Sequence, residues 1–218
     1  MKRSLLVLLG GFLLTAQAGA QAPAGKGWIS LFNGKDLSGW KNNGQEKWVV
    51  EEGTILGEST VGHYGYLTTE NTYSDYVLRL KFKCETDGNS GVFTRSTITG
   101  NSPATGPDIE GMQVEVDPTR HTGGIYESGR RGWVALPTPA GEKAIKAREW
   151  NDLEIAVEGR HYVTRLNGVQ CVDFLDPDPK FTNGIIALQL HTGGGVKIRF
   201  KDIYLLPLSV NPGTAGSK

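Results

Sequence analysis

Apolar and polar residues alternate along most of this chain in short runs, and glycine, asparagine and proline separate the runs. A period of two places successive side chains on opposite faces of a strand, whereas the 3.6-residue period of an amphipathic helix is nearly absent. The 30 glycines and 10 prolines supply the turns that many short strands need. The pattern predicts about eleven to thirteen strands in an all-β, antiparallel jelly-roll β-sandwich.

The clearest strands show which side faces the core. The segment 76–84 alternates apolar residues with Arg79, Lys81 and Lys83, so we expect one face in the core and the other in water. Segments 161–166 and 169–174 are joined by Asn167-Gly168, the strongest hairpin signal in the sequence. Further strands are predicted at 28–32, 37–40, 48–50, 54–56, 89–95, 111–117, 150–157, 184–191 and 196–206.

The strand predicted at 111–117 sorts its side chains most cleanly. Its apolar residues at 112, 114 and 116 point to one face, and Gln113, Glu115 and Asp117 point to the other at a spacing of roughly 7 Å. Three acid or amide groups with no lysine between them indicate a surface that holds a polar ligand. An ordinary solvated face is the alternative.

Two other predicted strands also place polar or aromatic side chains together on one face. In the segment 89–95, Asn89, Phe93 and Arg95 share a face, and in the segment 184–191, Gln189 and His191 point outward together. The concave face of a curved sheet is a natural groove for a saccharide, so we predict a ligand groove there. The side chains whose parity allows them to share it are Phe93, Arg95, Gln113, Glu115, Asp117, Gln189 and His191.

Two long segments between strands are predicted to be loops that frame this groove. The first runs from residue 96 to residue 109, and the second, 118–132, is rich in glycine and holds Tyr126 and Arg131. Trp133 follows the second loop, and we expect it to contact the ligand, with a place in the core as the alternative. Trp28 and Trp40 are interpreted as core anchors.

The start of the chain has the pattern of a signal peptide. Lys2 and Arg3 precede an apolar run at 5–14, and small residues suited to a peptidase follow at 16–20. The apolar run is too short to span a bilayer as a mature helix. We predict a bacterial-type signal peptide at 1–20, one jelly-roll domain at 21–208, and a disordered tail at 209–218. The mature protein is expected to be exported, periplasmic or secreted, and free of the membrane.

Charge and cysteine content narrow the partners further. Without Lys2 and Arg3, 21 basic residues stand against 23 acidic ones, a net charge of about −2 that predicts no nucleic-acid partner. Cys84 and Cys171 lie in strand-like runs, where a disulfide and two buried free thiols are both open.

Several blocks of the sequence resemble the 3-keto-disaccharide hydrolase family, long catalogued as a domain of unknown function. They occur in order and span nearly all of residues 28–208. The blocks are LFNGKDLSGW at 31–40, NSGVFTR at 89–95, EGMQVEVDP at 110–118, TGGIY at 122–126, RRGW at 130–133, EWN at 149–151 and IALQLH at 186–191. The resemblance implies a concanavalin A-like jelly roll, export in bacteria, and cleavage of glycosides whose sugar has been oxidised to a ketone at C3.

Such a substrate suggests a mechanism. A C3 ketone acidifies the C2 hydrogen, so a base can remove it, the enolate can expel the C1 oxygen, and water can add to the enone. We expect Glu115 or His191 to be the base, and Arg95 or a metal to stabilise the enolate. Asp117, or the other member of the first pair, would assist departure.

The remaining groove residues are expected to bind the sugar. Amide groups would contact its hydroxyls and aromatic rings would cover its apolar faces. The predicted binding residues are Asn89, Phe93, Gln113, Tyr126, Arg131, Trp133 and Gln189.

Each of these interpretations has an alternative. Arg95 could pair with Asp117 as a structural salt bridge. Glu115, Asp117 and His191 have donor atoms that suit a divalent metal, but they follow no ligand-spacing motif, so we predict no cofactor and keep the metal as the alternative. For the whole protein, the alternatives are a retaining glycosidase on the same fold and a non-catalytic carbohydrate-binding module.

Overall fold

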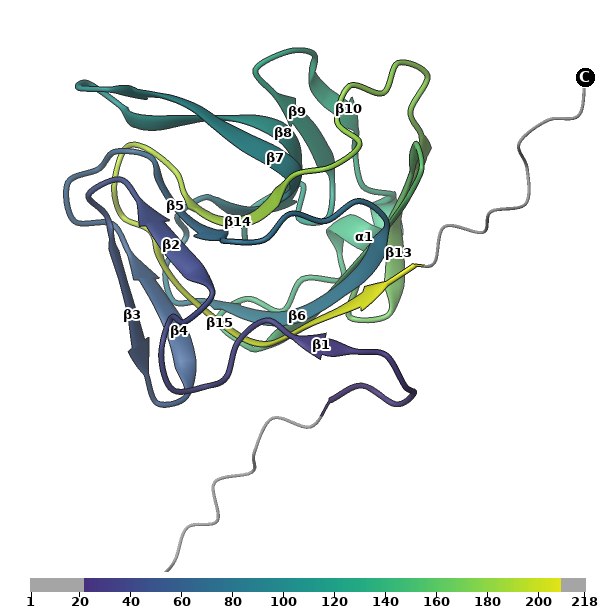
Figure 1. The fold of residues 1–218 in the computed structure, drawn as a ribbon, viewed down its shortest axis with the longest axis horizontal. Coiled ribbons are helices and arrows are strands. Elements are labelled where there is room, and N and C mark those ends of the chain that lie inside the picture. The colour runs from purple at the N-terminus through teal and green to yellow at the C-terminus, as the bar shows by residue number, and fades with distance from the viewer. Residues whose placement is uncertain (1–21, 209–218) are drawn as a thin grey trace, which may run out of the picture.

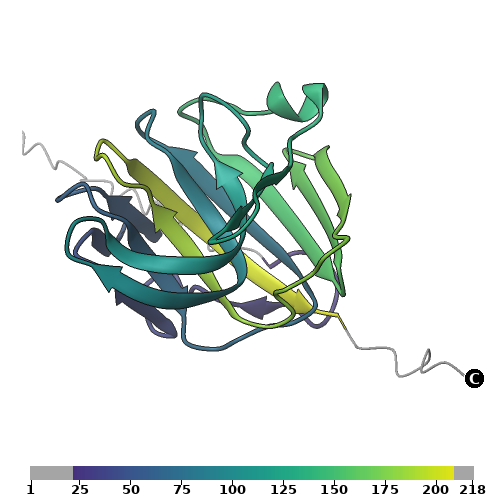
Figure 2. The ribbon, with the colours of Figure 1, turned by 90° about the horizontal axis from the view of Figure 1, so that it is seen from above.

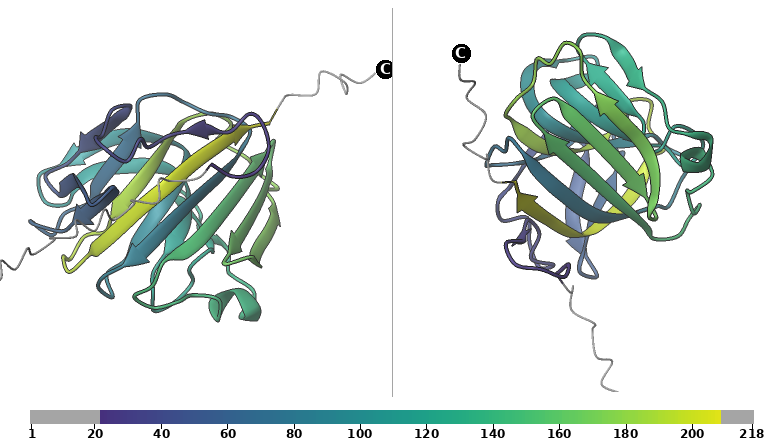
Figure 3. Two further views of the ribbon diagram at one scale, coloured as in Figure 1. Left: turned by 90° about the horizontal axis from the view of Figure 1, so that it is seen from below. Right: turned by 90° about the vertical axis from the view of Figure 1, so that its right-hand side faces the viewer.

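Two antiparallel sheets pack face to face in the computed structural model, which describes residues 22–208 (Figure 1). The predicted signal peptide at 1–20 and the predicted tail at 209–218 lie outside the described residues. In the eight-stranded sheet, the hydrogen-bonded order is β13 (Val169–Leu175), β12 (His161–Leu166), β11 (Asn151–Glu158), β6 (Tyr76–Cys84), β15 (Lys197–Pro207), β4 (Thr54–Glu58) and β3 (Lys47–Glu51). Strand β1 (Ile29–Ser30) pairs with β15 outside this path, and Figure 3 shows the long strand β15 crossing the sheet.

The seven-stranded sheet carries the residues that the sequence singles out. Its order is β10 (Gly132–Ala135), β9 (Ile125–Ser128), β8 (Gly106–Val116), β7 (Ser90–Ser102), β14 (Ile185–Leu190), β5 (Gly65–Thr69) and β2 (Trp40–Asn43). A single short helix, α1 (Pro139–Glu142), is present in the described chain, so the predicted all-β sandwich is confirmed. Within residues 22–208, no helix has the length and apolarity that crossing a membrane requires.

The core between the sheets follows the predicted alternation. On β6, Leu78, Leu80 and Phe82 are buried, while Arg79 on the outer face pairs with Glu154 at 2.7 Å. Burying each such apolar side chain stabilises the fold by about 1.5–3 kcal/mol. The strand assignments at 76–84, 161–166 and 169–174 are therefore confirmed.

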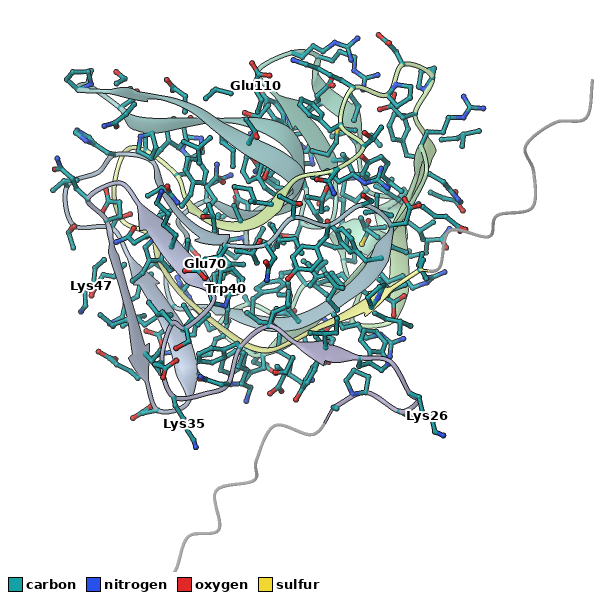
Figure 4. All side chains as sticks on the ribbon, in the orientation of Figure 1. Lys26, Lys35, Trp40, Lys47, Glu70 and Glu110 are labelled. Carbon is teal, nitrogen blue, oxygen red and sulfur yellow. The ribbon has the colours of Figure 1, made fainter. Side chains whose placement is uncertain are left out.

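The tryptophans predicted to anchor the core behave differently. Trp40 is buried on the inner side of β2, and its Nε1 donates to the Leu31 carbonyl at 2.6 Å (Figure 4). Trp28 is only half-buried, with the Arg79 guanidinium 5.0 Å from its ring centre. The core prediction is thus confirmed for Trp40 and wrong for Trp28.

The loop predicted at 96–109 is wrong, because this segment forms most of a long hairpin. Strands β7 and β8 pair from Ser90 opposite Val116 to Ser102 opposite Gly106, and the hairpin extends well beyond its neighbours (Figure 2). The β-branched run at 97–99 favours a strand, and Gly106 takes a φ of +84° at the turn. The predicted loop at 118–132 likewise contains β9.

The two cysteines are free and buried, so the thiol alternative is confirmed. Cys84 lies on β6 in the core. Cys171 lies on β13, where Gly123 and Gly141 pack so closely that a Cβ at either position would be within 2.9 Å of its sulfur. Because glycine has no Cβ, both positions leave room for the Cys171 thiol.

Candidate active site

A groove of about 590 Å³ lies on the face of the seven-stranded sheet that points away from the core. That volume is typical of a small-ligand site. Its walls are the extended hairpin, the start of β5 and the segment from β9 to β10. The lining residues are Tyr64, Tyr66, Asn89, Thr99, Pro107, Asp108, Ile109, Glu110, Gln113, Glu115, Tyr126, Ser128, Gly129, Trp133, Gln189 and His191.

Strand register places the central residues in one row across the floor of the groove. Tyr66 is opposite Gln189, Gln189 is opposite Gly91, and Gly91 is opposite Glu115. Directly opposite residues in an antiparallel sheet present their side chains on the same face. The prediction that Glu115 and Gln189 share a face, despite 73 intervening residues along the chain, is confirmed.

Glu115 is a nearly buried carboxyl group at the centre of this floor, with 4% of its surface exposed. Asn89 Nδ2 donates to its Oε1, and Gln113 Nε2 donates to its Oε2 at 2.6 Å. Burial raises the pKa of Glu115 to about 7, an effect that the negative charge of Asp117 reinforces and the two amide donors oppose. Such a group can both take up and release a proton near neutral pH.

Gly91 gives Gln113 the room to reach Glu115. A Cβ at Gly91 would lie 2.7 Å from Gln113 Nε2 and 2.8 Å from its Cγ, so the amide lies flat across the glycine. The φ of Gly91 is outside the left-handed region, unlike that of many other glycines here. Glycine at this position therefore provides space rather than backbone freedom.

His191 and Tyr64 form a second polar pair at the end of the same floor. His191 Nδ1 is 3.1 Å from the Thr192 carbonyl oxygen, and its Nε2 is 3.3 Å from the Tyr64 hydroxyl. The Thr192 hydroxyl also lies 3.4 Å from Nδ1, so both contacts of Thr192 are with Nδ1 and Nε2 is the ring nitrogen that faces Tyr64. Sequence reasoning missed Tyr64, although the alternation of Tyr64 and Tyr66 with Gly65 and Leu67 signals a strand with two aromatic rings on one face.

Asp117 does not line the groove, contrary to prediction. Strand β8 ends at Val116, and the Asp117 carboxylate turns back to accept from the Thr119 backbone N–H at 2.8 Å and the Thr119 hydroxyl at 2.6 Å. Only Asn89 Nδ2, at 3.5 Å, connects it to the site. Its effect on Glu115 is electrostatic.

Arg95 also lies elsewhere, so its predicted place in the groove is wrong. A bulge between Thr94 and Thr97 and a φ of +48° at Arg95 reverse the parity of β7 at this point. The guanidinium is 1% exposed and donates to Asp75 Oδ1 and to the Ser74 and Gly159 carbonyl oxygens, each at 2.5 Å. Arg95 is a structural ion-pair residue, with Asp75 as its partner in place of the expected Asp117.

Of the other predicted binding residues, two lie outside the groove lining. Phe93 is on the correct face but fully buried, with the Tyr66 ring covering it at 5.6 Å between centroids. Arg131 donates to both carboxylate oxygens of Asp176, at 2.8 and 2.9 Å, and to Glu127. Arg131 therefore neutralises the carboxylates of Glu127 and Asp176 and does not line the groove.

Aromatic side chains form one wall, as the sequence indicates. Trp133 is 42% exposed, so the core alternative is wrong for it. Its ring packs edge to face against Tyr126 and His121, with ring centroids 5.5 and 5.1 Å apart and interplanar angles of 82° and 73°. These contacts hold an exposed apolar surface of the kind on which sugar rings pack.

The groove lacks a fixed positive charge. No lysine or arginine belongs to its lining in residues 22–208, whereas Asp108, Glu110 and Glu115 do. Glu110, labelled in Figure 4, pairs with Lys180 at 2.8 Å. In the described part of the chain, no three His, Cys, Asp or Glu side chains are grouped as a metal site would require.

Two acceptors in the floor have no donor. Asn89 Oδ1 and Gln189 Oε1 are both buried, and neither accepts a hydrogen bond from the described protein. Buried polar atoms in this condition are uncommon and usually mark a place where a ligand or water donates.

Comparison with known proteins identifies related sequences. A family model described as the 3-keto-alpha-glucoside-1,2-lyase-like domain matches residues 27–206. A 3-keto-disaccharide hydrolase from Bacteroides thetaiotaomicron is 29% identical over 93 residues, which are 38% of this chain and 32% of that protein. The match thus spans about a third of the length of the curated relative.

Solved structures share the fold. A Parabacteroides distasonis protein assigned provisionally to the glycosyl hydrolases has a TM-score of 0.61 at 21% identity, over 84% of this chain and 95% of that one. A Bacillus subtilis protein with a galectin-like fold has a TM-score of 0.60 at 13% identity, over 78% and 89% of the two chains. The carbohydrate-binding module CBM66 of Bacillus subtilis has a TM-score of 0.57 at 17% identity, over 76% and 93%. The predicted concanavalin A-like jelly roll is confirmed.

Proposed function

Because this chain belongs to the family of 3-keto-alpha-glucoside-1,2-lyase-like domains, we propose that it cleaves glycosides whose sugar carries a ketone at C3. The proposed reaction removes the C2 proton, expels the oxygen at C1, and adds water across the resulting double bond. The saccharide lies in the groove of the seven-stranded sheet. Export to the periplasm or beyond belongs to the same proposal, on the pattern of residues 1–20.

The observation that carries the proposal is the environment of Glu115. A carboxyl group with a pKa of about 7, held by two amide donors on the floor of a ligand-sized groove, is suited to take a proton from carbon near neutral pH. A group that only bound hydroxyls would gain nothing from this costly burial. Perturbed pKa values of this kind concentrate at functional sites.

The other groove residues supply the remaining steps. Glu115 removes the C2 proton, and the electron pair of that bond forms an enolate with the C3 oxygen. The enolate returns as a ketone while a C1–C2 double bond forms and the C1–O bond breaks with its electrons on the leaving oxygen. His191 is at the end of the row and can provide the proton for that oxygen. Water then adds OH to C1 and gives its other hydrogen to the group that protonated the leaving oxygen, and C2 regains a proton from Glu115 after that carboxyl group has exchanged with solvent.

Neutral donors would stabilise the enolate oxygen, since Arg95 points away from the groove. The Gln189 amide and the tyrosine hydroxyls of the lining can serve. The unpartnered oxygens of Asn89 and Gln189 would in turn accept from sugar hydroxyls. Trp133 and Tyr126 offer the apolar wall for a sugar ring.

An ordinary two-carboxylate glycosidase fits this groove poorly. Retaining enzymes place the two carboxyl groups about 5–5.5 Å apart and inverting enzymes about 6.5–9.5 Å apart. Asp117, directly after β8, shares the Asn89 donor with Glu115, but its carboxylate accepts from Thr119 and is not part of the groove lining, so it is not placed beside a bound sugar. Glu110 lines the groove but is five residues from Glu115, roughly 16 Å along the strand.

A carbohydrate-binding module is the second candidate, favoured by the fold shared with CBM66. The two functions separate in one experiment. The protein is incubated with a 3-keto-glucoside and with its unoxidised parent, and release of the aglycone is followed. We expect release from the 3-keto compound alone. Binding of the keto sugar without release from either compound would make the protein a binding module, and equal release from both would make it an ordinary glycosidase.

A further inference from the structure

We propose that Tyr64 is a catalytic residue that delivers the proton to the departing glycosidic oxygen, and that Glu46 is the residue that positions it. The inference rests on the proposed function and adds two residues that are absent from the site predicted from the sequence.

Tyr64 is in direct contact with His191, and both side chains line the groove. Thr192 occupies Nδ1 of His191, which leaves Nε2 facing the Tyr64 hydroxyl at 3.3 Å. The two rings meet edge to face at 4.9 Å between centroids, and the Tyr64 ring stacks on Tyr66 with an interplanar angle of 11°. Tyr64 also lines the groove, so its hydroxyl is within reach of both His191 and a ligand bound there.

The backbone of Tyr64 packs against the turn of the β7–β8 hairpin. Its N–H donates to the Thr105 carbonyl at 2.7 Å. A Cβ at Gly106 would be 2.6 Å from the Tyr64 carbonyl oxygen, and one at Gly44 would be 3.0 Å from it. Both glycines have positive φ, so the close approach depends on residues that lack a side chain.

Glu46 fixes the loop that leads into Tyr64. Its carboxylate is 1% exposed and accepts from the backbone N–H groups of Thr60, Val61 at 3.3 Å and His63 at 2.7 Å. Gly65 makes room for it, because a Cβ there would be 2.6 Å from that of Glu46.

The partners of Glu46 are thus loop N–H groups rather than a cation. Burying a carboxylate is costly unless hydrogen bonds compensate, and these bonds all go to the residues directly before Tyr64. A buried charge used in this way, beside a groove, sets the position of a functional side chain.

The proton transfers balance in both steps. In the elimination, the phenolic hydrogen of Tyr64 passes to the leaving oxygen as the C1–O bond breaks, and the phenolate takes a hydrogen from Nε2 of protonated His191. In the hydration, the pair works in reverse and accepts a proton from the water that adds at C1. Glu115 handles only the hydrogen at C2.

The test compares two leaving groups. Tyr64→Phe is assayed on a methyl and on a 4-nitrophenyl 3-keto-glucoside, and exchange of the C2 hydrogen with deuterated water is measured on the methyl compound. A nitrophenolate leaves without protonation, so we expect about a 100-fold loss of turnover on the methyl glucoside and a loss of less than about 5-fold on the nitrophenyl one. Exchange at C2 should continue at the wild-type rate.

Equal losses on the two substrates, or loss of C2 exchange, would overturn the role of Tyr64. A wild-type protein that neither exchanges the C2 hydrogen nor cleaves either compound would instead overturn the proposed function. Wild-type C2 exchange together with cleavage of the methyl glucoside that does not depend on Tyr64 leaves the function standing and removes this inference alone.

Glu46→Gln tests the positioning role. The amide introduces a donor where the loop needs an acceptor, so turnover on the methyl glucoside should fall by about 10-fold or more while that on the nitrophenyl glucoside changes little. Added to Tyr64→Phe, it should cause no further loss, because both act through one group. The matched control is Glu51→Gln on β3, whose side chain is 45% exposed and which should leave both rates unchanged. Additive losses would overturn the role of Glu46, and if Glu46→Gln does not fold, as seen by circular dichroism, Tyr64→Phe decides alone.

Discussion

The pKa of Glu115, and with it the ability of this residue to act as a base, is set by the groups around it in the fold. The two-residue period of β8 predicts that it leaves the core and shares a face with Gln113. Its raised pKa comes from burial, and the Asn89 donor that opposes this shift is 26 residues earlier in the chain. A single sequence gives the parity of a strand but not which side chains a register will bring together, so the position was predictable and the chemistry was not.

At the residue scale, Gly91 and Gln113 should act as one unit. Gln113→Ala removes a donor to the Glu115 carboxylate, so the pKa of Glu115 should rise and the acid limb of the pH profile of kcat/KM should move upward. Gly91→Ala should do the same, because its Cβ would displace the Gln113 amide. We expect each change to lower kcat/KM at pH 7 by about 10-fold, and the double variant to match Gln113→Ala alone.

A matched control for Gly91 is available on the same strand. Gly100 also lacks a left-handed φ, and a Cβ there would meet only the end of the flexible Asp108 side chain at 3.1 Å. Gly100→Ala should leave the pH profile in place. If Gly91→Ala lowered activity further in the Gln113→Ala background, glycine would matter for another reason, such as direct space for the ligand.

At the element scale, strand faces were predictable and breaks in the strands were not. Alternation correctly placed the buried side of β6 and the outward Gln189 and His191 on and beside β14. It failed at Arg95, because a bulge inserts a residue and inverts every assignment that follows on that stretch of β7. The residue types around the bulge do not predict it, because Arg95 adopts a φ of +48° and arginine rarely takes that backbone conformation.

Arg95 should therefore affect stability and not chemistry. Arg95→Met removes a donor from two backbone carbonyl groups and leaves Asp75 with the Gly159 N–H alone. Breaking a mostly buried pair in this way costs about 2–4 kcal/mol of unfolding free energy. Urea unfolding measures the loss. Lys81→Met, which breaks the exposed pair with Asp152, is the control and should cost less than about 1 kcal/mol. A stable Arg95→Met variant that had lost turnover would contradict this assignment.

At the scale of the whole molecule, the sandwich and the family followed from the sequence, because turn residues and two-residue periods are distributed over the entire described chain. The family match over residues 27–206 agrees with the blocks seen in the sequence. What could not be predicted is how distant strands combine. The hairpin of β7 and β8 and the loop held by Glu46 together bring Tyr64 to His191, a contact across 127 positions of sequence.

The buried Glu115 should also be visible in the stability of the whole protein. Its pKa is about 7 in the folded state against 4.5 as the ordinary value, so between these pH values the folded state binds more protons than the unfolded state. Unfolding free energy from this group therefore falls as pH rises from about 4.5 to about 7, by up to about 3 kcal/mol. Glu115→Gln removes the ionisation, so denaturant midpoints should show its stability gaining on the wild type across this window. A difference that did not change with pH would contradict the raised pKa.

The central claim is that the glycosidic bond breaks after a proton leaves C2, and the fate of that hydrogen tests it most directly. A 3-keto-glucoside is cleaved in deuterated water, and the C2 position of the released sugar is examined by mass spectrometry and NMR at early times. The released sugar incubated without protein sets the background exchange, and Glu115→Gln should lower turnover by at least about 100-fold. We expect deuterium at C2 in every cleaved molecule. Hydrogen retained at C2 would contradict the account and favour direct displacement at C1.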